Sequence, residues 1–436
     1  MHTLDLSMDH VTKIEGDAAL TIHAEDGKVT KVTFGITEYK RFFTEAMKGK
    51  SIYAIPAHLS RVCGTCSSAH VMAAIEACEM ALDIEPTPQT KMLRALTMHG
   101  LIVRDHALHL YLFAMPDIFG KDAFLEFDEN DPVQHQMLHD AFAIKAAGNY
   151  LATIVSGRSI HATFPVIGGF THFPSQEEVD EAIKKLADIR EAAIRCVNIF
   201  ANAPFHFDRK TNYMALVPND TFGYIYGKIQ TSKGETIDEK SYRDLIEHVS
   251  LSYSQASAYK YKGESYLVGA LARLNVAQDK LHPKTKESLA EVLKRFPSTD
   301  IFQQNTAQAI EIVHSIDEAI DLLKNNKIVP EPIIKKPARD AVGIGVVEAP
   351  RGILYHRVHL GADGKIIEGA VIVPTNQNQL NIEEDVGRLV EQMIAEGVPK
   401  EDMVPKIENL IRAYDPCMSC AAHFLKVTWE ETNSKK

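Results

Sequence analysis

The stretch RVCGTCSSAH at residues 61–70 places Cys63 and Cys66 three positions apart, immediately before a helical pattern. A second pair with the same spacing, Cys417 and Cys420, lies almost at the other end of the sequence. Residues three positions apart at a helix entry or tight turn face the same way, so each pair can offer two sulfurs to one metal ion. A site that uses both pairs must bring the two ends of the chain together, and this requirement decides the fold.

Four cysteine thiolates can bind zinc, iron, nickel or an iron–sulfur cluster. Cys66 and Cys417 stand 351 positions apart, which argues against a compact zinc ribbon. A closed structural zinc site between the two ends is the alternative interpretation. A thioredoxin-like redox pair is not indicated, because neither pair lies in a βαβ pattern. Cys66 precedes a helix whose N-terminal dipole favours thiolate, and Arg61 adds positive charge nearby.

The composition is that of a soluble globular protein, with 436 residues, 45% hydrophobic and 24% charged. The formal net charge is -11 and the lysines and arginines are scattered, so nucleic acid is not an expected partner. Six cysteines are too few for a disulfide framework. Cys78 and Cys196 lie in helical patterns, and we expect them to be buried core residues.

Neither an export signal nor a membrane span is expected. The N-terminal sequence MHTLDLSMDH has no basic start and no apolar run of signal-peptide length. The best candidate for a membrane helix, residues 95–115, is interrupted by Arg104, Asp105 and three histidines. We therefore expect a cytoplasmic protein.

Hydrophobic periodicity predicts a mainly α (α+β) fold, a large helical bundle core with small peripheral antiparallel sheets, in one domain. Asp26-Gly27 is a strong hairpin signal, and Ser175 with Glu178 forms a capping box at a helix start. The spacing of apolar residues gives the other elements. The expected elements are a hairpin over 18–37, helices over 67–83, 88–114, 133–155 and 175–202, a second helical set over about 240–325, strands from about 340 to 373, and helices over 380–396 and 402–413.

The residues around both cysteine pairs resemble the large, catalytic subunit of nickel–iron hydrogenases. RVCGTCSSAH and DPCMSCAAH are similar to that family's two signature motifs, RxCGxCxxxH near the start and DPCxxCxxH at the end. The similarity extends to four further segments. These are VTKIEGDAAL at 11–20, GRSIHATFPVIGG at 157–169, EAPRG at 348–352 and VPTNQNQLNIEED at 373–385. The resemblance implies the large-subunit fold, as one catalytic domain over residues 1–423.

The same resemblance implies a cofactor and a reaction. Nickel is expected to be held by Cys63, Cys66, Cys417 and Cys420, with Cys66 and Cys420 bridging to an iron that carries two cyanides and one carbon monoxide. Dihydrogen is apolar and barely acidic, so no side chain splits it without a metal. The implied enzyme is an oxidoreductase that cleaves dihydrogen reversibly and heterolytically, and a terminal thiolate receives the first proton.

Four polar residues match positions around that centre in the family. Glu15 is expected to relay the proton, although by itself it reads as part of a solvated turn. Arg351 is expected to present a cation to the open side of the centre, although it also fits an ordinary strand end. Asp105 and Asp415 are expected to orient Arg351. The alternatives are a helix stop at Asp415 and an ion pair between Asp105 and Arg104.

Three further residues are implied to contact the centre. His70 is expected to hydrogen-bond near a bridging sulfur, although a lone histidine in an apolar helix is more often a satisfied core residue. Pro350 and Thr375 are expected to line the pocket around the cyanides, Thr375 through its hydroxyl group.

The resemblance also concerns a magnesium ion near the centre and the end of the chain. Thr44 stands where the family often has a glutamate that helps to hold this ion, which puts that site in doubt unless Glu45 replaces it. His423 is a candidate ligand of the same ion. The residues after His423, 424–436, are expected to form an extension that a dedicated endopeptidase removes once nickel is inserted.

Electrons from the centre need a route that this chain does not contain. With four of the six cysteines assigned to the metals, Cys78 and Cys196 are too few for a four-cysteine cluster. The resemblance implies an iron–sulfur small subunit, further electron-transfer subunits, a nickel chaperone and the maturation endopeptidase as partners. The alternatives are a zinc-binding structural protein and a respiratory quinone-reductase relative, and the latter lacks the four cysteines that this chain keeps.

Overall fold

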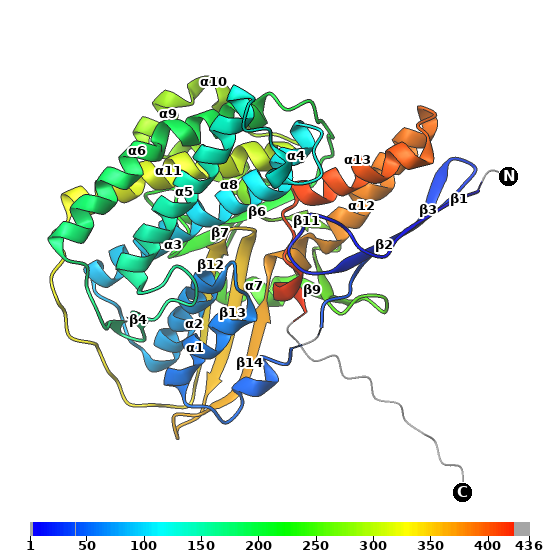
Figure 1. The fold of residues 1–436 in the computed structure, drawn as a ribbon. Coiled ribbons are helices and arrows are strands. Elements are labelled where there is room, and N and C mark those ends of the chain that lie inside the picture. The colour runs from blue at the N-terminus through cyan, green and yellow to red at the C-terminus, as the bar shows by residue number, and fades with distance from the viewer. Residues whose placement is uncertain (1–2, 40, 423–436) are drawn as a thin grey trace, which may run out of the picture.

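The computed structural model describes residues 3–39 and 41–422, and its largest part is a bundle of long helices (Figure 1). α11 is buried over most of its length and packs against α3 and α6, while α5 packs against α3 and α6 from the other side. The bundle thus has its own apolar centre. The bounds of these helices are α3 (Pro88–Ala107), α5 (Pro132–Ser156), α6 (Gln176–Ala201) and α11 (Gln303–Asn325).

The helix ends follow capping signals in the sequence. Ser175 and Glu178 form the predicted capping box at the start of α6, with Ser175 N donating to the Glu178 carboxylate at 2.8 Å. Asp131 caps the start of α5, and Gly157 ends that helix in the left-handed conformation. α3 does not stop where its regular part ends. It continues through the π-helical turn η4 (Leu108–Ala114) into α4 (Met115–Ile118).

A three-stranded antiparallel sheet carries α2 (Ser67–Leu82) on one face. Its strands are β12 (Ala341–Ala349), β13 (Gly352–Leu360) and β14 (Ile366–Ile372). Two glycines of β12 allow close contact, because a Cβ at Gly343 would lie 1.8 Å from Ala77 O, and one at Gly345 would lie 2.2 Å from Ala73 O. The sheet therefore fixes the helix that begins directly after Cys66.

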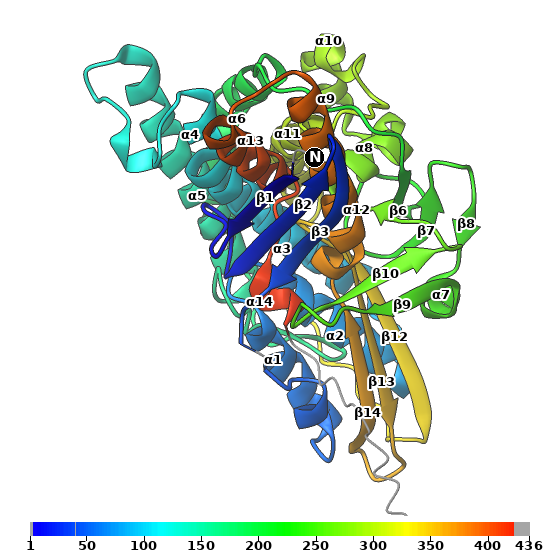
Figure 2. The ribbon, with the colours of Figure 1, turned by 90° about the vertical axis from the view of Figure 1, so that its right-hand side faces the viewer.

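The N-terminal sheet lies across the other end of the molecule. Figure 2 shows β1 (Thr3–Met8), β2 (Ala18–Glu25) and β3 (Lys28–Ile36) beside α12 (Pro374–Ala395). β2 and β3 form the predicted hairpin around Asp26-Gly27. The loop between β1 and β2 reaches the C-terminal segment that follows α13 (Lys400–Ala413). The two ends of the chain thus meet, as the cysteine spacing requires.

The remaining elements are short. The other helices described are α1 (Ile55–Leu59), α7 (Glu239–Leu245), α8 (Ala270–Ala277), α9 (Pro283–Ser288), α10 (Ala290–Leu293) and α14 (Met418–Ala421), with 3-10 turns η1 (Glu45–Met47), η2 (Ile52–Ala54), η3 (Ser60–Val62), η5 (Phe124–Glu126) and η6 (Gln278–Lys280). The other strands described are β4 (Pro165–Val166), β5 (Gly169–Phe170), β6 (Asn212–Pro218), β7 (Gly227–Thr231), β8 (Thr236–Ile237), β9 (Ile246–Ser250), β10 (Ser257–Tyr261) and β11 (Tyr266–Leu267).

The predicted mainly α fold with small sheets is confirmed, with two corrections. The expected helical run over about 240–325 is wrong between 246 and 267, where β9, β10 and β11 form instead. This segment is rich in tyrosine and serine, and aromatic residues are favoured in strands. The small sheets are not all antiparallel, since β11 pairs with β6 in parallel. Among the described residues, no helix is both long and apolar enough to cross a membrane.

Candidate metal centre

The structure brings the sulfurs of Cys63, Cys66, Cys417 and Cys420 into one buried cluster. All four Sγ atoms lie within 4.8 Å of one another. The Sγ–Sγ distance is 3.4 Å between Cys63 and Cys417, 3.1 Å between Cys66 and Cys420, and 3.1 Å between Cys417 and Cys420. Each of these residues is at most 3% exposed. The predicted convergence of the two cysteine pairs is therefore present in the fold.

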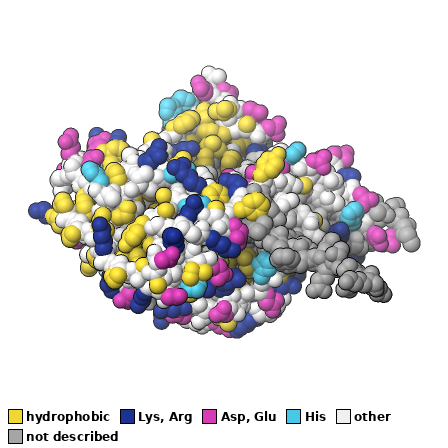
Figure 3. Space-filling view, turned by 90° about the horizontal axis from the view of Figure 1, so that it is seen from below, with side chains coloured by type: hydrophobic (Ala, Val, Ile, Leu, Met, Phe, Trp, Pro, Cys, Tyr) yellow, Lys and Arg dark blue, Asp and Glu magenta, His cyan; other side chains and the backbone are white. Residues whose placement is uncertain are grey.

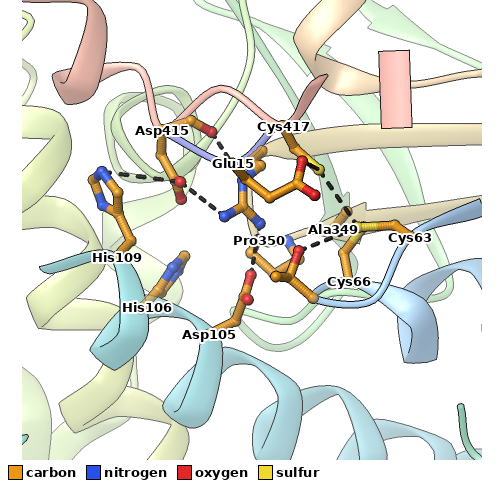
Figure 4. Close-up of polar contacts among 12 residues, drawn as sticks. Glu15, Cys63, Cys66, Asp105, His106, His109, Ala349, Pro350, Asp415 and Cys417 are labelled. Atoms are coloured by element: carbon orange, nitrogen blue, oxygen red, sulfur yellow. Dashed lines mark hydrogen bonds and ion pairs between the residues drawn. The ribbon is translucent and has the colours of Figure 1, made fainter. Parts of the chain in front are cut away.

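Different local structures present the two pairs. Cys63 is extended, directly after η3, and Cys66 is the N-cap residue of α2. Cys417 forms an isolated parallel bridge with Glu15, and Cys420 lies in α14. Figure 4 shows Cys63, Cys66 and Cys417 turned toward one another, with Glu15 beside Cys417. The N-terminal loop thus forms one wall of the pocket.

The donor set fits the metal that the sequence predicts. Burial raises the pKa of the Cys417 and Cys420 thiols well above the usual value. The contact with the Cys417 sulfur lowers the pKa of Cys63. Metal binding requires thiolates, and four buried thiolates in contact need a cation to compensate their charge. Four soft sulfur ligands suit nickel, iron or zinc.

Arg351 lies beside the cluster and contacts both aspartates that the sequence suggested. Its Nη1 donates to Asp105 Oδ2 at 2.7 Å, and its Nη2 lies 2.8 Å from Asp415 Oδ1. Its Nε donates to the Asp415 carbonyl oxygen at 2.8 Å. Arg351 is 2% exposed and occupies the two-residue turn between β12 and β13. Asp105 therefore pairs with Arg351, whereas Arg104 donates to the backbone oxygen of Thr65.

Glu15 is joined to the second cysteine pair through both its backbone and its side chain. Its carbonyl oxygen accepts a hydrogen bond from Met418 N at 2.9 Å. Its Oε2 lies 3.0 Å from Cys417 Sγ and accepts a hydrogen bond from Ser419 N at 3.1 Å. The residue is partly exposed. Its carboxylate therefore contacts the Cys417 sulfur and is also partly open to solvent.

The three remaining candidates also lie around the cluster. His70 Nε2 is 3.8 Å from Cys420 Sγ, and His70 Nδ1 is 3.1 Å from His356 Nε2. Thr375 Oγ1 accepts a hydrogen bond from Cys417 N at 2.9 Å. Pro350 precedes Arg351 in the same turn. Cys78 and Cys196, which were expected to be core residues, are both fully buried.

The structure describes two of the three residues considered for a second metal ion, Thr44 and Glu45. Thr44 is buried, with 9% exposure. Glu45 forms an exposed ion pair with Lys48 at 2.7 Å, so its carboxylate is engaged at the surface. His423 and the expected extension lie outside the described residues.

Sequence reasoning missed a residue that links the two motifs. Arg41 Nη2 donates to Val62 O at 2.9 Å and to Ser419 O at 2.5 Å, and Arg41 N donates to Ala422 O at 3.1 Å. Val62 and Ser419 directly precede Cys63 and Cys420. One guanidinium group therefore ties the backbone of both cysteine pairs together. The only signal was an arginine in the RFFTE segment, and its local sequence does not reveal such distant partners.

Comparison with known proteins finds relatives that align with this chain over nearly its full length. The chain matches the nickel-dependent hydrogenase family over residues 41–136 and 225–423. It is 31% identical to Sulfhydrogenase 2 subunit alpha of Pyrococcus furiosus, over 97% of this chain and 100% of that protein. It is 26% identical to the NAD-reducing hydrogenase HoxS subunit beta of Cupriavidus necator, over 96% of this chain and 94% of that protein.

Two solved structures that resemble this chain are also hydrogenases. An NAD+-reducing nickel–iron hydrogenase in the H2-reduced state superposes with a TM-score of 0.85 at 25% identity, over 96% of this chain and 99% of that chain. The nickel–iron–selenium hydrogenase of D. vulgaris Hildenborough gives a TM-score of 0.79 at 21% identity, over 97% of this chain and 100% of that chain, and shows the fold alone. The chain therefore belongs to the nickel-dependent hydrogenase family, as a large subunit and an oxidoreductase acting on dihydrogen.

Proposed function

We propose that this chain is the catalytic subunit of a hydrogenase that cleaves dihydrogen reversibly and heterolytically at a nickel–iron centre. The observation that carries this proposal is the convergence of four buried sulfurs from both ends of the chain within 4.8 Å. Cys63, Cys66, Cys417 and Cys420 would hold this nickel–iron group through their sulfurs, and its iron would carry two cyanides and one carbon monoxide. When bound, this group supplies the Lewis acidity that polarises dihydrogen.

Arg351 supplies a fixed positive charge next to the sulfurs. Its three contacts with Asp105 and Asp415 hold the guanidinium in one orientation, so no reorganisation is needed when charge develops in the reaction. Pro350 and Thr375 line the same pocket. The Thr375 oxygen accepts from Cys417 N, which leaves its hydroxyl hydrogen free to donate to a cyanide. His70 tunes the Cys420 sulfur from 3.8 Å.

Glu15 moves the proton away from the centre. The Cys417 thiol donates to Glu15 Oε2 over 3.0 Å, which is short enough for direct transfer. The Ser419 N–H on the same oxygen holds the carboxylate in place. Glu15 is partly exposed, so a proton on its carboxyl group can pass to solvent.

Electrons leave through an iron–sulfur partner subunit. Cys78 and Cys196 are buried in separate helices and hold no cluster. Outside the first cysteine pair, His161 donates its N–H to Ser67 Oγ at 2.9 Å, and the neighbouring Ile160 is 42% exposed. An exposed apolar residue so close to the centre supports docking of the partner here. Relatives named subunit alpha or subunit beta also support further electron-transfer subunits.

The rest of the proposal concerns maturation and location. Residues 1–423 form one catalytic domain, and an endopeptidase removes 424–436 after a nickel chaperone has delivered the metal. His423 then contributes to a magnesium site. The protein works in the cytoplasm. Figure 3 shows one face of the molecule, on which hydrophobic, basic and acidic side chains are interspersed.

The test uses the complex purified with its native partners. Nickel, iron in excess of nickel because the iron–sulfur partner adds its own, infrared bands of metal-bound cyanide and carbon monoxide, and dye reduction that depends on dihydrogen are the expected results. Zinc as the sole metal, without these bands, overturns the proposal. Intact-mass measurement of the active complex tests the processing step, and a full-length chain with full activity contradicts it.

A further inference from the structure

A buried arginine on α8 holds the turn that carries Arg351. Arg273 is 1% exposed, and each of its five N–H groups has an acceptor. Its Nε and Nη2 bind the two carboxylate oxygens of Glu311 at 2.6 and 2.7 Å, and Nη1 binds Glu348 Oε2 at 2.7 Å. The two remaining bonds go to backbone oxygens.

These two backbone oxygens belong to the residues immediately before Arg351. Nη1 donates to Ala349 O at 3.1 Å, and Nη2 donates to Pro350 O at 3.0 Å. Figure 4 shows Ala349 and Pro350 beside the aspartates and cysteines of the centre. Gly352, which closes the turn, has φ +127, and a Cβ there would lie 2.6 Å from Val268. Arg273 thus binds the backbone of this turn, and the turn packs closely against Val268.

The carboxylates that orient Arg273 come from two different layers of the fold. Glu311 lies on α11 and also binds His106 Nε2 at 2.7 Å, and Glu348 lies on β12 and accepts from Leu216 N at 2.6 Å. The ring of Tyr224 faces the guanidinium at 5.7 Å from its centroid. This network is fully buried. It contacts the turn that carries Arg351 but no cysteine sulfur. The proposed reaction gives it no role.

We propose that Arg273 is a positioning residue, which fixes the backbone of Ala349 and Pro350 so that the Arg351 guanidinium is aimed at the metal centre. Only a planar fork with five donors can satisfy two carboxylates and two carbonyls at once. A lysine keeps the charge but offers three donors from a single atom. The inference rests on the proposed role of Arg351.

The test compares Arg273→Lys with Arg94→Lys in the purified complex. Arg94 is a matched control because it is also 1% exposed and forms a bidentate pair with Glu79, but it does not touch the Arg351 turn. We expect Arg273→Lys to retain nickel and iron and to lose about 10- to 100-fold in hydrogen turnover, as misplacement of a catalytic group does. Arg94→Lys keeps turnover within about threefold. Equal turnover in the two variants overturns the proposal.

Two further measurements separate positioning from general damage. In an Arg351→Lys background, adding Arg273→Lys is expected to lower hydrogen turnover by less than about a further threefold, because both changes remove the same interaction. If Arg273→Lys lowers hydrogen turnover by the same factor with and without Arg351→Lys, the proposal is overturned. A crystal structure of Arg273→Lys should show the Arg351 guanidinium displaced from Asp105, and an unmoved guanidinium overturns it. This structural readout does not depend on the metals, so it stands even if the proposed hydrogenase chemistry fails.

Glu348→Gln is the variant to test if Arg273→Lys does not fold. This change keeps the pair between Arg273 and Glu311 and weakens the contacts of residue 348 with Arg273 and with Leu216 N. We expect intact metal content and a loss of about 3- to 10-fold in turnover. Turnover equal to that of the unmodified complex, with the turn unmoved, contradicts the proposal.

Discussion

The two cysteine pairs reach the same pocket by different means. Cys63 and Cys66 lead directly into α2, a helix of 16 residues that is held against β12 by close approach at Gly343. Cys417 and Cys420 belong to a segment with only the four-residue helix α14, and the described chain ends two residues after Cys420. The first pair is built into the core, whereas the second is docked onto it.

The contacts of the second pair come from segments far away in sequence. Glu15 pairs with Cys417 along the backbone, Arg41 binds Ser419 O, and Thr375 accepts from Cys417 N. Few local interactions hold this segment, so its position depends on these distant partners. The two halves of the site therefore differ in what holds them: α2 packs on the sheet, whereas the C-terminal segment depends on partners from distant parts of the chain.

The largest expected effect comes from removing a ligand of the docked half. Cys417→Ser should lower hydrogen turnover by at least about 1,000-fold and nickel content by more than half, because a hydroxyl is a poor ligand for a soft metal. Metal analysis and dye reduction on the purified complex measure both quantities. Cys196→Ala is the matched control, since Cys196 is equally buried but lies outside the cluster. Normal nickel content in Cys417→Ser contradicts a four-sulfur site.

A change in the preformed half should act on stability. Gly343→Ala places a Cβ 1.8 Å from Ala77 O and forces α2 away from β12, so we expect the free energy of unfolding to fall by about 3 kcal/mol. Urea denaturation measures this change. Gly234→Ala is the control, because nothing lies within 4 Å of its added Cβ and only its φ of +82 opposes the change, at about 1 kcal/mol. Equal losses in both variants contradict the close-packing account.

Glu15→Gln should separate proton movement from metal binding. Glutamine still accepts the hydrogen bond from Ser419 N but is not a base, so turnover should fall about 100-fold while the metals stay bound. Glu408→Gln is the control, since Glu408 binds the backbone of Thr12 in the same loop at 2.8 Å and lies away from the sulfurs. If Glu15→Gln turns over within twofold of the unmodified complex, Glu15 is not the relay.

The smallest expected effect concerns docking of the C-terminal segment. Arg41→Lys should weaken the charged hydrogen bonds to Val62 O and Ser419 O and speed hydrogen exchange about tenfold over residues 417–422. Exchange over residues 67–82 should not change, because α2 is held by the sheet. Arg61→Lys, an exposed change beside the first cysteine pair, is the control. Faster exchange in both regions would show that the two halves are held in the same way.

Local signals in the sequence predicted much of this molecule. Asp26-Gly27 predicted the hairpin and Ser175 predicted the start of α6, because turn and cap chemistry depend on neighbouring residues. The two CxxC motifs predicted that the chain ends meet. The strands over 246–267 were missed although β9 and β10 pair locally and the segment is rich in aromatic residues, which are favoured in strands. Only β11 pairs with a distant strand, β6.

The resemblance indicated the buried contacts of Arg351 with Asp105 and Asp415, but the sequence did not reveal those of Arg273 and Arg41. Arg273 lies in an ordinary helical segment, LARLNVA, and its partners Glu311 and Glu348 are 38 and 75 positions away. Arg41 likewise has partners near both ends of the chain. The identity of such a residue is visible in the sequence, but its partners are set by how helices and strands pack in three dimensions.

The bridge between Glu15 and Cys417 has a consequence for unfinished chains. The same backbone pairing that seats the last cysteines also delivers the carboxylate to its sulfur. In the proposed mechanism, a chain whose C-terminal segment is not seated therefore lacks both two of the four sulfur ligands and the sulfur–carboxylate contact that carries the proton. Closing the ligand set and forming the proton route are a single structural step.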